Sequence, residues 1–139
     1  MSVRQFACIL LVAGSAAACS DDSQLKACQD GRDPKKQFAA CTKVINSDPK
    51  LAEAHNNRCF ANNELQQYDK SLIDCNTAIK LDPKNASAYN NRGVAYEMRG
   101  ELDPALADYS KAITLYPKFA TAFANRGDVH SKQNDRERA

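Results

Sequence analysis

Six cysteines are the residues of this 139-residue chain with the clearest capacity for chemistry. Four of them follow one another at spacings of 13, 18 and 16 residues: Cys28, Cys41, Cys59 and Cys75. There is no Cys-x-x-Cys pair to form a zinc ribbon or a thioredoxin-like redox site, and His55 and His130 do not complete a metal set. We therefore expect two structural disulfides and neither a metal site nor a cofactor, with buried unpaired thiols as the alternative.

Arginines recur 34 residues apart at three positions, and aspartates at two: Arg58, Arg92, Arg126, Asp74 and Asp108. We expect Asp74 to pair with Arg92 in a structural ion pair. Asp108 is expected to pair in the same way with Arg126. Arg58 is then left without a carboxylate, because alanine occupies the equivalent site one period earlier.

Enzymatic sites and nucleic-acid interfaces have no counterpart in the sequence. It offers no nucleophile beside a base, no phosphate-binding glycine loop and no convergent pair of acids, so we expect no stand-alone enzyme. The formal net charge is +2, and lysine and arginine are interspersed among aspartate and glutamate. No basic stripe therefore predicts binding to nucleic acid.

A pair of helices must position these side chains. Within residues 86–119 the apolar spacing predicts helices of about fourteen residues on each side of Gly100. Residues 52–85 match this stretch at 14 of 34 positions without a gap, and the same pattern begins again at Ala120. Because one hairpin cannot bury its own apolar face, the sequence predicts an all-α solenoid of about three and a half 34-residue repeats.

The repeated residues resemble the tetratricopeptide repeat family. The resemblance rests on Tyr89, Gly93 and Tyr96 in the first helix, Ala105 and Tyr109 in the second, and the closing prolines Pro83 and Pro117. Small residues let the helices approach closely, while the tyrosines supply the area to be buried. The resemblance implies that the first helices line a concave groove that holds extended segments of partner proteins.

The repeat also suggests how the cysteines pair. Cys59 occupies the position of Gly93, where the helices of a hairpin come closest, and Cys75 that of a tyrosine on the inner side of the second helix. Of three possible connectivities, we expect the one in which each bond joins the two helices of one hairpin. The expected pairs are Cys28 with Cys41 and Cys59 with Cys75.

Residues 1–18 have the features of a signal peptide: Arg4 is their single charge, and an apolar core at residues 6–13 is followed by small residues. The alanines before Cys19 fit a peptidase site and also resemble a bacterial lipobox, although lipoboxes usually carry leucine at the position of Ala16. We expect lipid on Cys19, because this leaves an even number of cysteines in an oxidising compartment. The alternative is an exported chain with a free Cys19 thiol.

The chain is expected to divide into a signal peptide at 1–18, a tether with a degenerate first helix at 19–33, and a repeat domain at 34–139. The repeats span approximately residues 18–51, 52–85, 86–119 and 120–139, of which the first is degenerate and the last partial. We expect the last helix to turn at Gln133-Asn134 and to leave an uncapped face through which the chain could associate with itself.

Asparagines form a third periodic set, at Asn56, Asn57, Asn90, Asn91 and Asn125. The resemblance places them on the groove, where an amide can satisfy both the C=O and the N–H of a partner's backbone. The lysines that some family members use to grip a C-terminal carboxylate are absent, which argues against a chaperone-tail clamp. Those positions hold Asn56, Asn90 and Ala124, and Phe60, Val94 and Asp128. Solvated asparagines that repeat duplication has preserved are the alternative.

The sequence thus predicts a non-catalytic scaffold that binds a protein or peptide. We expect it in the periplasm or cell envelope, held at the membrane only through lipid on Cys19. Two other interpretations are a thiol-active redox protein, which would need an accessible low-pKa cysteine, and a self-associating structural subunit.

Overall fold

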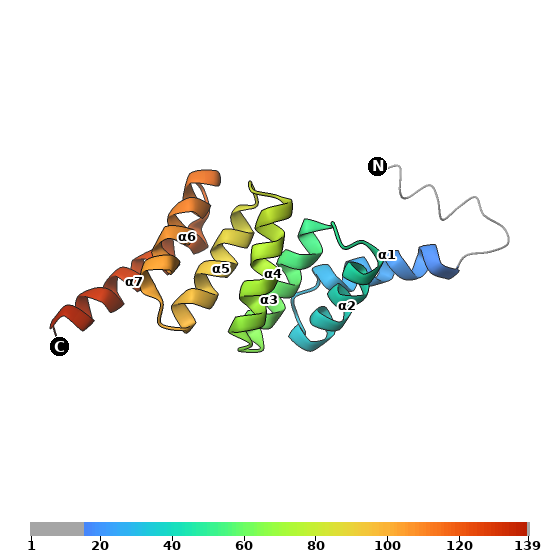
Figure 1. The fold of residues 1–139 in the computed structure, drawn as a ribbon, viewed down its shortest axis with the longest axis horizontal. Coiled ribbons are helices and arrows are strands. Elements are labelled where there is room, and N and C mark those ends of the chain that lie inside the picture. Colours follow the sequence, from blue (N-terminus) through green and yellow to red (C-terminus); the bar gives the residue numbers. More distant parts are fainter. Residues whose placement is uncertain (1–15, 139) are drawn as a thin grey trace.

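The computed structural model of the protein describes residues 16–138, which form α-helices and no strands. The helices are α1 (Ala16–Gln29), α2 (Pro34–Ser47), α3 (Ala52–Glu64), α4 (Tyr68–Leu81), α5 (Ala86–Met98), α6 (Leu102–Leu115) and α7 (Ala120–Arg138). They follow one another along an elongated array (Figure 1). The predicted all-α solenoid is therefore confirmed. The apolar core of the predicted signal peptide lies outside the described residues.

Three antiparallel hairpins, α1–α2, α3–α4 and α5–α6, precede the single helix α7. The second helix of each hairpin ends two residues before a proline, at Pro49, Pro83 and Pro117. The turns of the second and third hairpins each contain a residue with positive φ, which is Gln66 at 57° and, at the equivalent position, Gly100 at 80°. Proline and the turn residue thus separate the helices at the 34-residue period.

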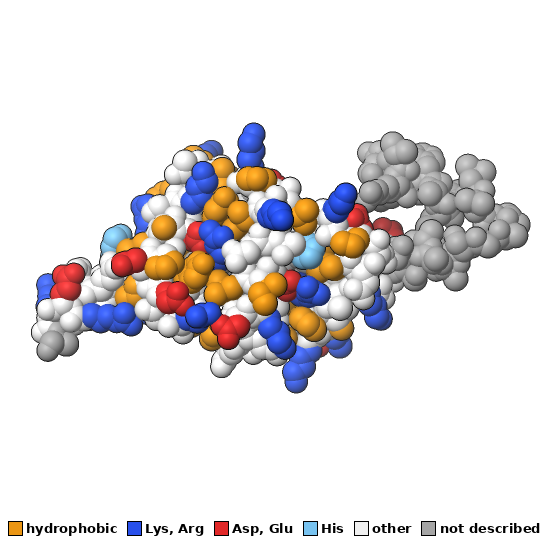
Figure 2. All heavy atoms as spheres, in the orientation of Figure 1, with side chains coloured by type: hydrophobic (Ala, Val, Ile, Leu, Met, Phe, Trp, Pro, Cys, Tyr) orange, Lys and Arg blue, Asp and Glu red, His pale blue; other side chains and the backbone are white. Residues whose placement is uncertain are grey.

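The hairpins stack so that one set of helices lies on the inside of a curve. Each first helix contacts the next one, α1 with α3, α3 with α5 and α5 with α7, whereas within residues 16–138 the second helices do not contact one another. The array therefore curves with α1, α3, α5 and α7 on its inner face. Figure 2 shows lysine and arginine interspersed with aspartate and glutamate over the side that it presents.

Gly93 and Tyr109 form the closest contact of the third hairpin. The Tyr109 ring is fully buried, and a Cβ placed on Gly93 would lie 2.7 Å from its Cε1 atom. The phenol donates a hydrogen bond of 2.7 Å to Glu97 Oε2. Burial, and secondly this bond to a carboxylate, raise the pKa of Tyr109 well above its ordinary value. Glycine here makes room for the largest side chain in the core of the repeat.

Disulfides join the two helices in the first and second hairpins, and the one in the second hairpin takes the place of that contact. Cys59, at the position of Gly93, is bonded to Cys75, at the position of Tyr109, with their Cα atoms 5.3 Å apart. Cys28 is bonded to Cys41 across the first hairpin, with a Cα separation of 4.6 Å. All four side chains are 0% exposed. The structure thus brings together the cysteines that the sequence pairs, and each bond joins the two helices of one hairpin.

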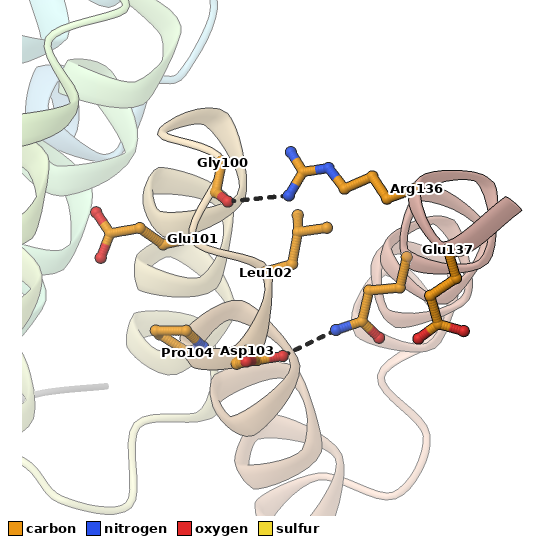
Figure 3. A pocket seen from close by; sticks show the side chains of 8 residues that line it. Gly100, Glu101, Leu102, Asp103, Pro104, Arg136 and Glu137 are labelled. Carbon is orange, nitrogen blue, oxygen red and sulfur yellow. Dashed lines mark hydrogen bonds between the residues drawn. The ribbon is translucent and has the colours of Figure 1, made fainter. Parts of the chain in front are cut away.

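Two helices are longer than the sequence predicts. The turn expected at Gln133-Asn134 is wrong, because α7 continues to Arg138. Gln133 Nε2 donates to Asp103 Oδ1 at 2.8 Å, so the end of α7 stays beside the start of α6 (Figure 3). At the other end, α1 begins at Ala16, so the segment expected to be a tether after Cys19 is helical. Among the described residues no helix is both long and apolar enough to cross a membrane.

Candidate functional site

Asparagine side chains link the first helices of successive hairpins along the inner face. Asn91 Nδ2 donates to Asn56 Oδ1 at 3.0 Å, and Asn125 Nδ2 donates to Asn90 Oδ1 at 3.2 Å. Asn56 and Asn90 are only 8% and 6% exposed. These two amides therefore hold neighbouring helices together, and they present little surface to a partner.

The other three asparagines remain accessible. Asn57, Asn91 and Asn125 are half-buried, and the Oδ1 atom of each accepts no hydrogen bond from any residue of the described chain. Asn57 Nδ2 makes only a long contact of 4.0 Å with the sulfur of Cys28. We call these three side chains the asparagine row. Each offers a free acceptor, and the two that bond to another asparagine keep a second N–H hydrogen, so the row can pair with peptide groups.

The residues one turn beyond the asparagine row decide its chemical surroundings. These residues are Phe60, Val94 and Asp128, in α3, α5 and α7. Phe60 is 36% exposed and lies beside the turn between α1 and α2, where a Cβ on Gly31 would be 3.4 Å from its ring. The row is thus flanked by two apolar side chains and one carboxylate, and by no cation at these positions.

The predicted pairing of arginine with aspartate is wrong, because the arginines bind the aspartate of their own hairpin and not that of the preceding one. Arg92 binds Asp108 with two hydrogen bonds of 2.7 Å, rather than Asp74. Arg58, expected to lack a carboxylate, binds Asp74 through bonds of 2.9 Å and 2.6 Å. The hydrogen bond with Asp108 raises the pKa of the Arg92 guanidinium above its ordinary value. Each pair therefore lies within its own hairpin, Arg58 with Asp74 in α3–α4 and Arg92 with Asp108 in α5–α6.

Antiparallel geometry explains this pairing. Arg92 and Asp108 stand at equal distances along the chain from the turn residue Gly100, so the two helices bring them to the same level. The arginines also reach the preceding hairpin: Arg92 Nη1 donates to Asn76 Oδ1 at 2.7 Å, and Arg58 Nη1 to Thr42 Oγ1 at 3.3 Å. Each arginine thus fastens its own hairpin through a carboxylate and the previous one through a neutral oxygen.

Two buried asparagines beside the row had no place in the sequence prediction. Asn63 Nδ2 donates to the backbone oxygen of Asn91 at 2.8 Å, and Asn62 Nδ2 donates to Asp74 Oδ2 at 2.9 Å. Asn62 occupies the position of Tyr96 in the next repeat, and Asn63 occupies that of Glu97. This departure from the repeat, amides in place of an aromatic ring and an acid, was the signal that could have indicated their structural role.

Metal and thiol chemistry find little support in the described residues. No group of three histidine, cysteine, aspartate or glutamate side chains among them could hold a metal ion. His55 is buried, with Nε2 2.9 Å from the backbone oxygen of Pro49 and Nδ1 3.8 Å from Asp74 Oδ1. The four cysteines whose side chains are described are bonded and buried, which weighs against a thiol-active protein.

Comparison with known proteins identifies the repeat. A family model described as "Tetratricopeptide repeat" matches residues 86–119, and one described as "TPR repeat" matches residues 61–100. The tetratricopeptide domain of Arabidopsis OM64 is 26% identical, with a TM-score of 0.76 over 81% of this chain and 96% of that one. No curated protein matches the sequence.

Two further solved structures are similar. MamA is 26% identical, with a TM-score of 0.74 over 84% of this chain and 70% of that one. The first tetratricopeptide domain of Spaghetti (RPAP3), bound to the HSP90 peptide SRMEEVD, is 23% identical, with a TM-score of 0.74 over 90% of this chain and 98% of that one. At this identity the likeness to the Spaghetti domain shows a shared fold.

Proposed function

Because tetratricopeptide repeat models match residues 61–100 and 86–119, we propose that the chain is a protein-interaction module of this family that binds an extended partner segment along its inner face. The asparagine row is the observation that carries this proposal, since it leaves three amide oxygens free on consecutive first helices. The Spaghetti domain, solved with an HSP90 peptide, supports this mode of binding by a similar fold.

The spacing of the row suits a peptide backbone. Neighbouring helices pack about 8 to 10 Å apart, and an extended chain advances roughly 3.3 Å per residue. One asparagine therefore meets about every third residue of the partner. Its oxygen can accept the N–H of a peptide group, and an unused amide hydrogen can bond to a C=O. Recognition of the backbone is independent of the partner's side chains, so the sequence preference should be broad.

The flanking residues restrict the charge of the partner. The positions at which some relatives grip a terminal carboxylate hold amide, alanine, apolar or acidic side chains: Asn56, Asn90, Ala124, Phe60, Val94 and Asp128. Asp128 in particular would repel an acidic segment at the α7 end of the row. The proposed partner is therefore a neutral or basic extended segment with an apolar side chain for Phe60 and Val94, rather than an acidic C-terminal tail.

The asparagine row can be tested by substituting Asn57, which makes no strong bond within the described chain. Peptides selected from a random display library against the oxidised protein supply the ligand. We expect Asn57→Ala to weaken their binding about two- to tenfold, the effect of one net hydrogen bond, with unchanged helicity. Calorimetric titration measures this affinity.

Asn46→Ala supplies the matched control, because Asn46 is an exposed asparagine on α2. It should leave the affinity unchanged, and the acidic peptide SRMEEVD should not bind. Equal affinities for the wild type and Asn57→Ala, or tight binding of SRMEEVD, would contradict the proposal. Asn91→Ala is less informative, because it also removes the donor to buried Asn56.

We also propose that the protein is exported and held at a bacterial membrane by lipid on Cys19. The two buried disulfides support this location, because such bonds persist in oxidising compartments. Intact-mass measurement of the protein from a membrane fraction should give a chain that begins at Cys19 and carries lipid. Cys19→Ser should remove the lipid and release the protein from the membrane. A native chain that still begins at Met1 would refute export, and a cleaved chain with a free Cys19 would refute the anchor.

A further inference from the structure

The side of α7 that corresponds to the α6-binding side of α5 carries no helix in the described chain. On α5, a Cβ on Gly93 would lie 2.7 Å from the Tyr109 ring of α6. At the equivalent Gly127 of α7, a Cβ would meet nothing within 4 Å. Phe123, at the position of Tyr89, is 44% exposed. This side of α7 thus resembles the side of α5 that packs against α6, but no second helix covers it in the described chain.

Arg126 belongs to the same open surface and lacks the carboxylate that its counterparts bind. Arg58 and Arg92 each hold an aspartate of the following helix through two hydrogen bonds. Arg126 has a single long bond, 3.4 Å, from Nη1 to Ser110 Oγ. Its guanidinium carbon lies 5.4 Å from the centroid of the Phe123 ring, much as Arg92 lies 5.5 Å from Tyr89. The cation is therefore already oriented for a carboxylate.

We propose that this open face, formed by Phe123, Arg126 and Gly127, binds an amphipathic helix of a partner protein. The internal template for the partner is Ala105, Asp108 and Tyr109 of α6. The partner helix accordingly carries a small residue, then an aspartate three positions later, then directly an aromatic residue. Its aspartate pairs with Arg126, and its ring covers Gly127.

A second copy of this chain does not meet these requirements. Within the described residues, the helix with this pattern is α6, and its Tyr109 is fully buried against Gly93. Its carboxylate, Asp108, is bound to Arg92. The nearest alternative, α4, has cysteine in place of the aromatic residue, and that cysteine is in a disulfide. Both helices would have to leave their own hairpins, so a second copy does not supply the helix that fits the open face.

The proposed contact is distinct from the asparagine row. Asn125 faces α5 through its bond to Asn90, whereas Arg126 and Gly127 correspond to residues that face a second helix. One helix thus contributes to two surfaces, the inner face for an extended segment and the open face for a helical one.

Nuclear magnetic resonance titration of the labelled, oxidised chain tests the proposal. The probe is a synthetic peptide with the sequence of residues 101–117, which contains α6. We expect chemical-shift changes centred on Gly127 of α7. Arg126→Gln in the protein, or asparagine in place of aspartate in the peptide, should weaken binding about tenfold or more, since a hydrogen-bonded charge pair is lost.

Two further variants separate binding from folding. Arg138→Gln makes the same change of charge at an exposed site of the same helix and should alter the affinity less than twofold. Gly127→Leu should leave the helicity unchanged, because its Cβ has free space, and should abolish binding by filling the place of the ring.

Several results would overturn the proposal. These are the absence of shift changes, changes centred on α5, equal binding by the wild type and Arg126→Gln, and a doubling of the protein's mass in solution without peptide. Shift changes confined to Asn57, Asn91 and Asn125 would also overturn it, and would support the proposed function of the inner face. Conversely, failure of the Asn57→Ala test leaves the prediction for α7 standing.

Discussion

Replacing all four paired cysteines by alanine is expected to lower the free energy of unfolding by about 6 kcal/mol. Each disulfide closes a short loop, with sequence separations of 13 and 16 residues, and the chain-entropy model assigns about 3 kcal/mol to each. Domains are typically stable by about 5 to 15 kcal/mol in total. We therefore expect the variant to lose most of its helical signal well below the urea midpoint of the oxidised protein, as circular dichroism would record.

A rescue variant distinguishes the disulfide from simple filling of space. Cys59→Gly with Cys75→Tyr rebuilds in the second hairpin the contact of Gly93 with Tyr109. The new phenol would find Asn63 Oδ1, at the position of Glu97, which is buried and has no partner in the described chain. Relative to alanine at both sites, this variant should regain about 2 kcal/mol from the buried ring. Equal stability of the two variants would show that the hairpins are not interchangeable here.

Arg92→Ala is expected to lower the free energy of unfolding by about 3 kcal/mol. The substitution leaves Asp108, whose side chain is 7% exposed, without its cation, and removing one partner of a buried pair costs about 3 to 5 kcal/mol. The lower end applies because the Arg92 side chain is 21% exposed. Urea denaturation of the purified variant measures the loss.

The matched control for this prediction is Arg126→Ala, one period later. Arg126 has only the long bond to Ser110, so its removal should change stability by less than about 0.5 kcal/mol. A double-mutant cycle should show strong coupling of Arg92 to Asp108 and weaker coupling to Asp74. Similar losses for both arginines, or stronger coupling to Asp74, would contradict the pairing within one hairpin.

The apolar spacing, Gly100 and the closing prolines were enough to predict the two helices of the third hairpin. Helices α5 and α6 have 13 and 14 residues and lie on the two sides of Gly100, close to the fourteen expected for each, and Asp33 caps α2 by accepting hydrogen bonds from two backbone amides. These features are local, because a cap or a closing proline acts on the helix beside it. Because the sequence repeats, the same local prediction then applies to each repeat along the chain.

Contacts between helices were harder to predict, because a repeated sequence offers two partners for every residue. Arg92 is 16 residues from Asp108 and 18 from Asp74, and the period alone does not choose between them. The turn at Gly100 does choose, since it places Arg92 and Asp108 at one level. The end of α7 was missed for another reason: contacts of Gln133 and Arg136 with the start of α6 favour a continued helix over a turn.

The candidate site shows the same limit. The sequence identified the periodic asparagines but could not divide them into buried and accessible members. Asn90 and Asn91 are adjacent and alike in composition, yet Asn90 accepts a bond from Asn125 while Asn91 exposes its oxygen. The division depends on how neighbouring first helices pack, which is set by contacts remote in sequence.

The placement of the disulfides also determines where the array can bend. Each bond lies inside one hairpin, so it stiffens that unit and leaves the angle to the next unit unconstrained. The joints are crossed by side-chain packing and by non-covalent polar bonds, such as Asn91 to Asn56 and Arg92 to Asn76. Such bonds exchange with water at small net cost. Bending therefore occurs between hairpins rather than within them. The array can change its curvature to fit a bound segment while every helix stays intact.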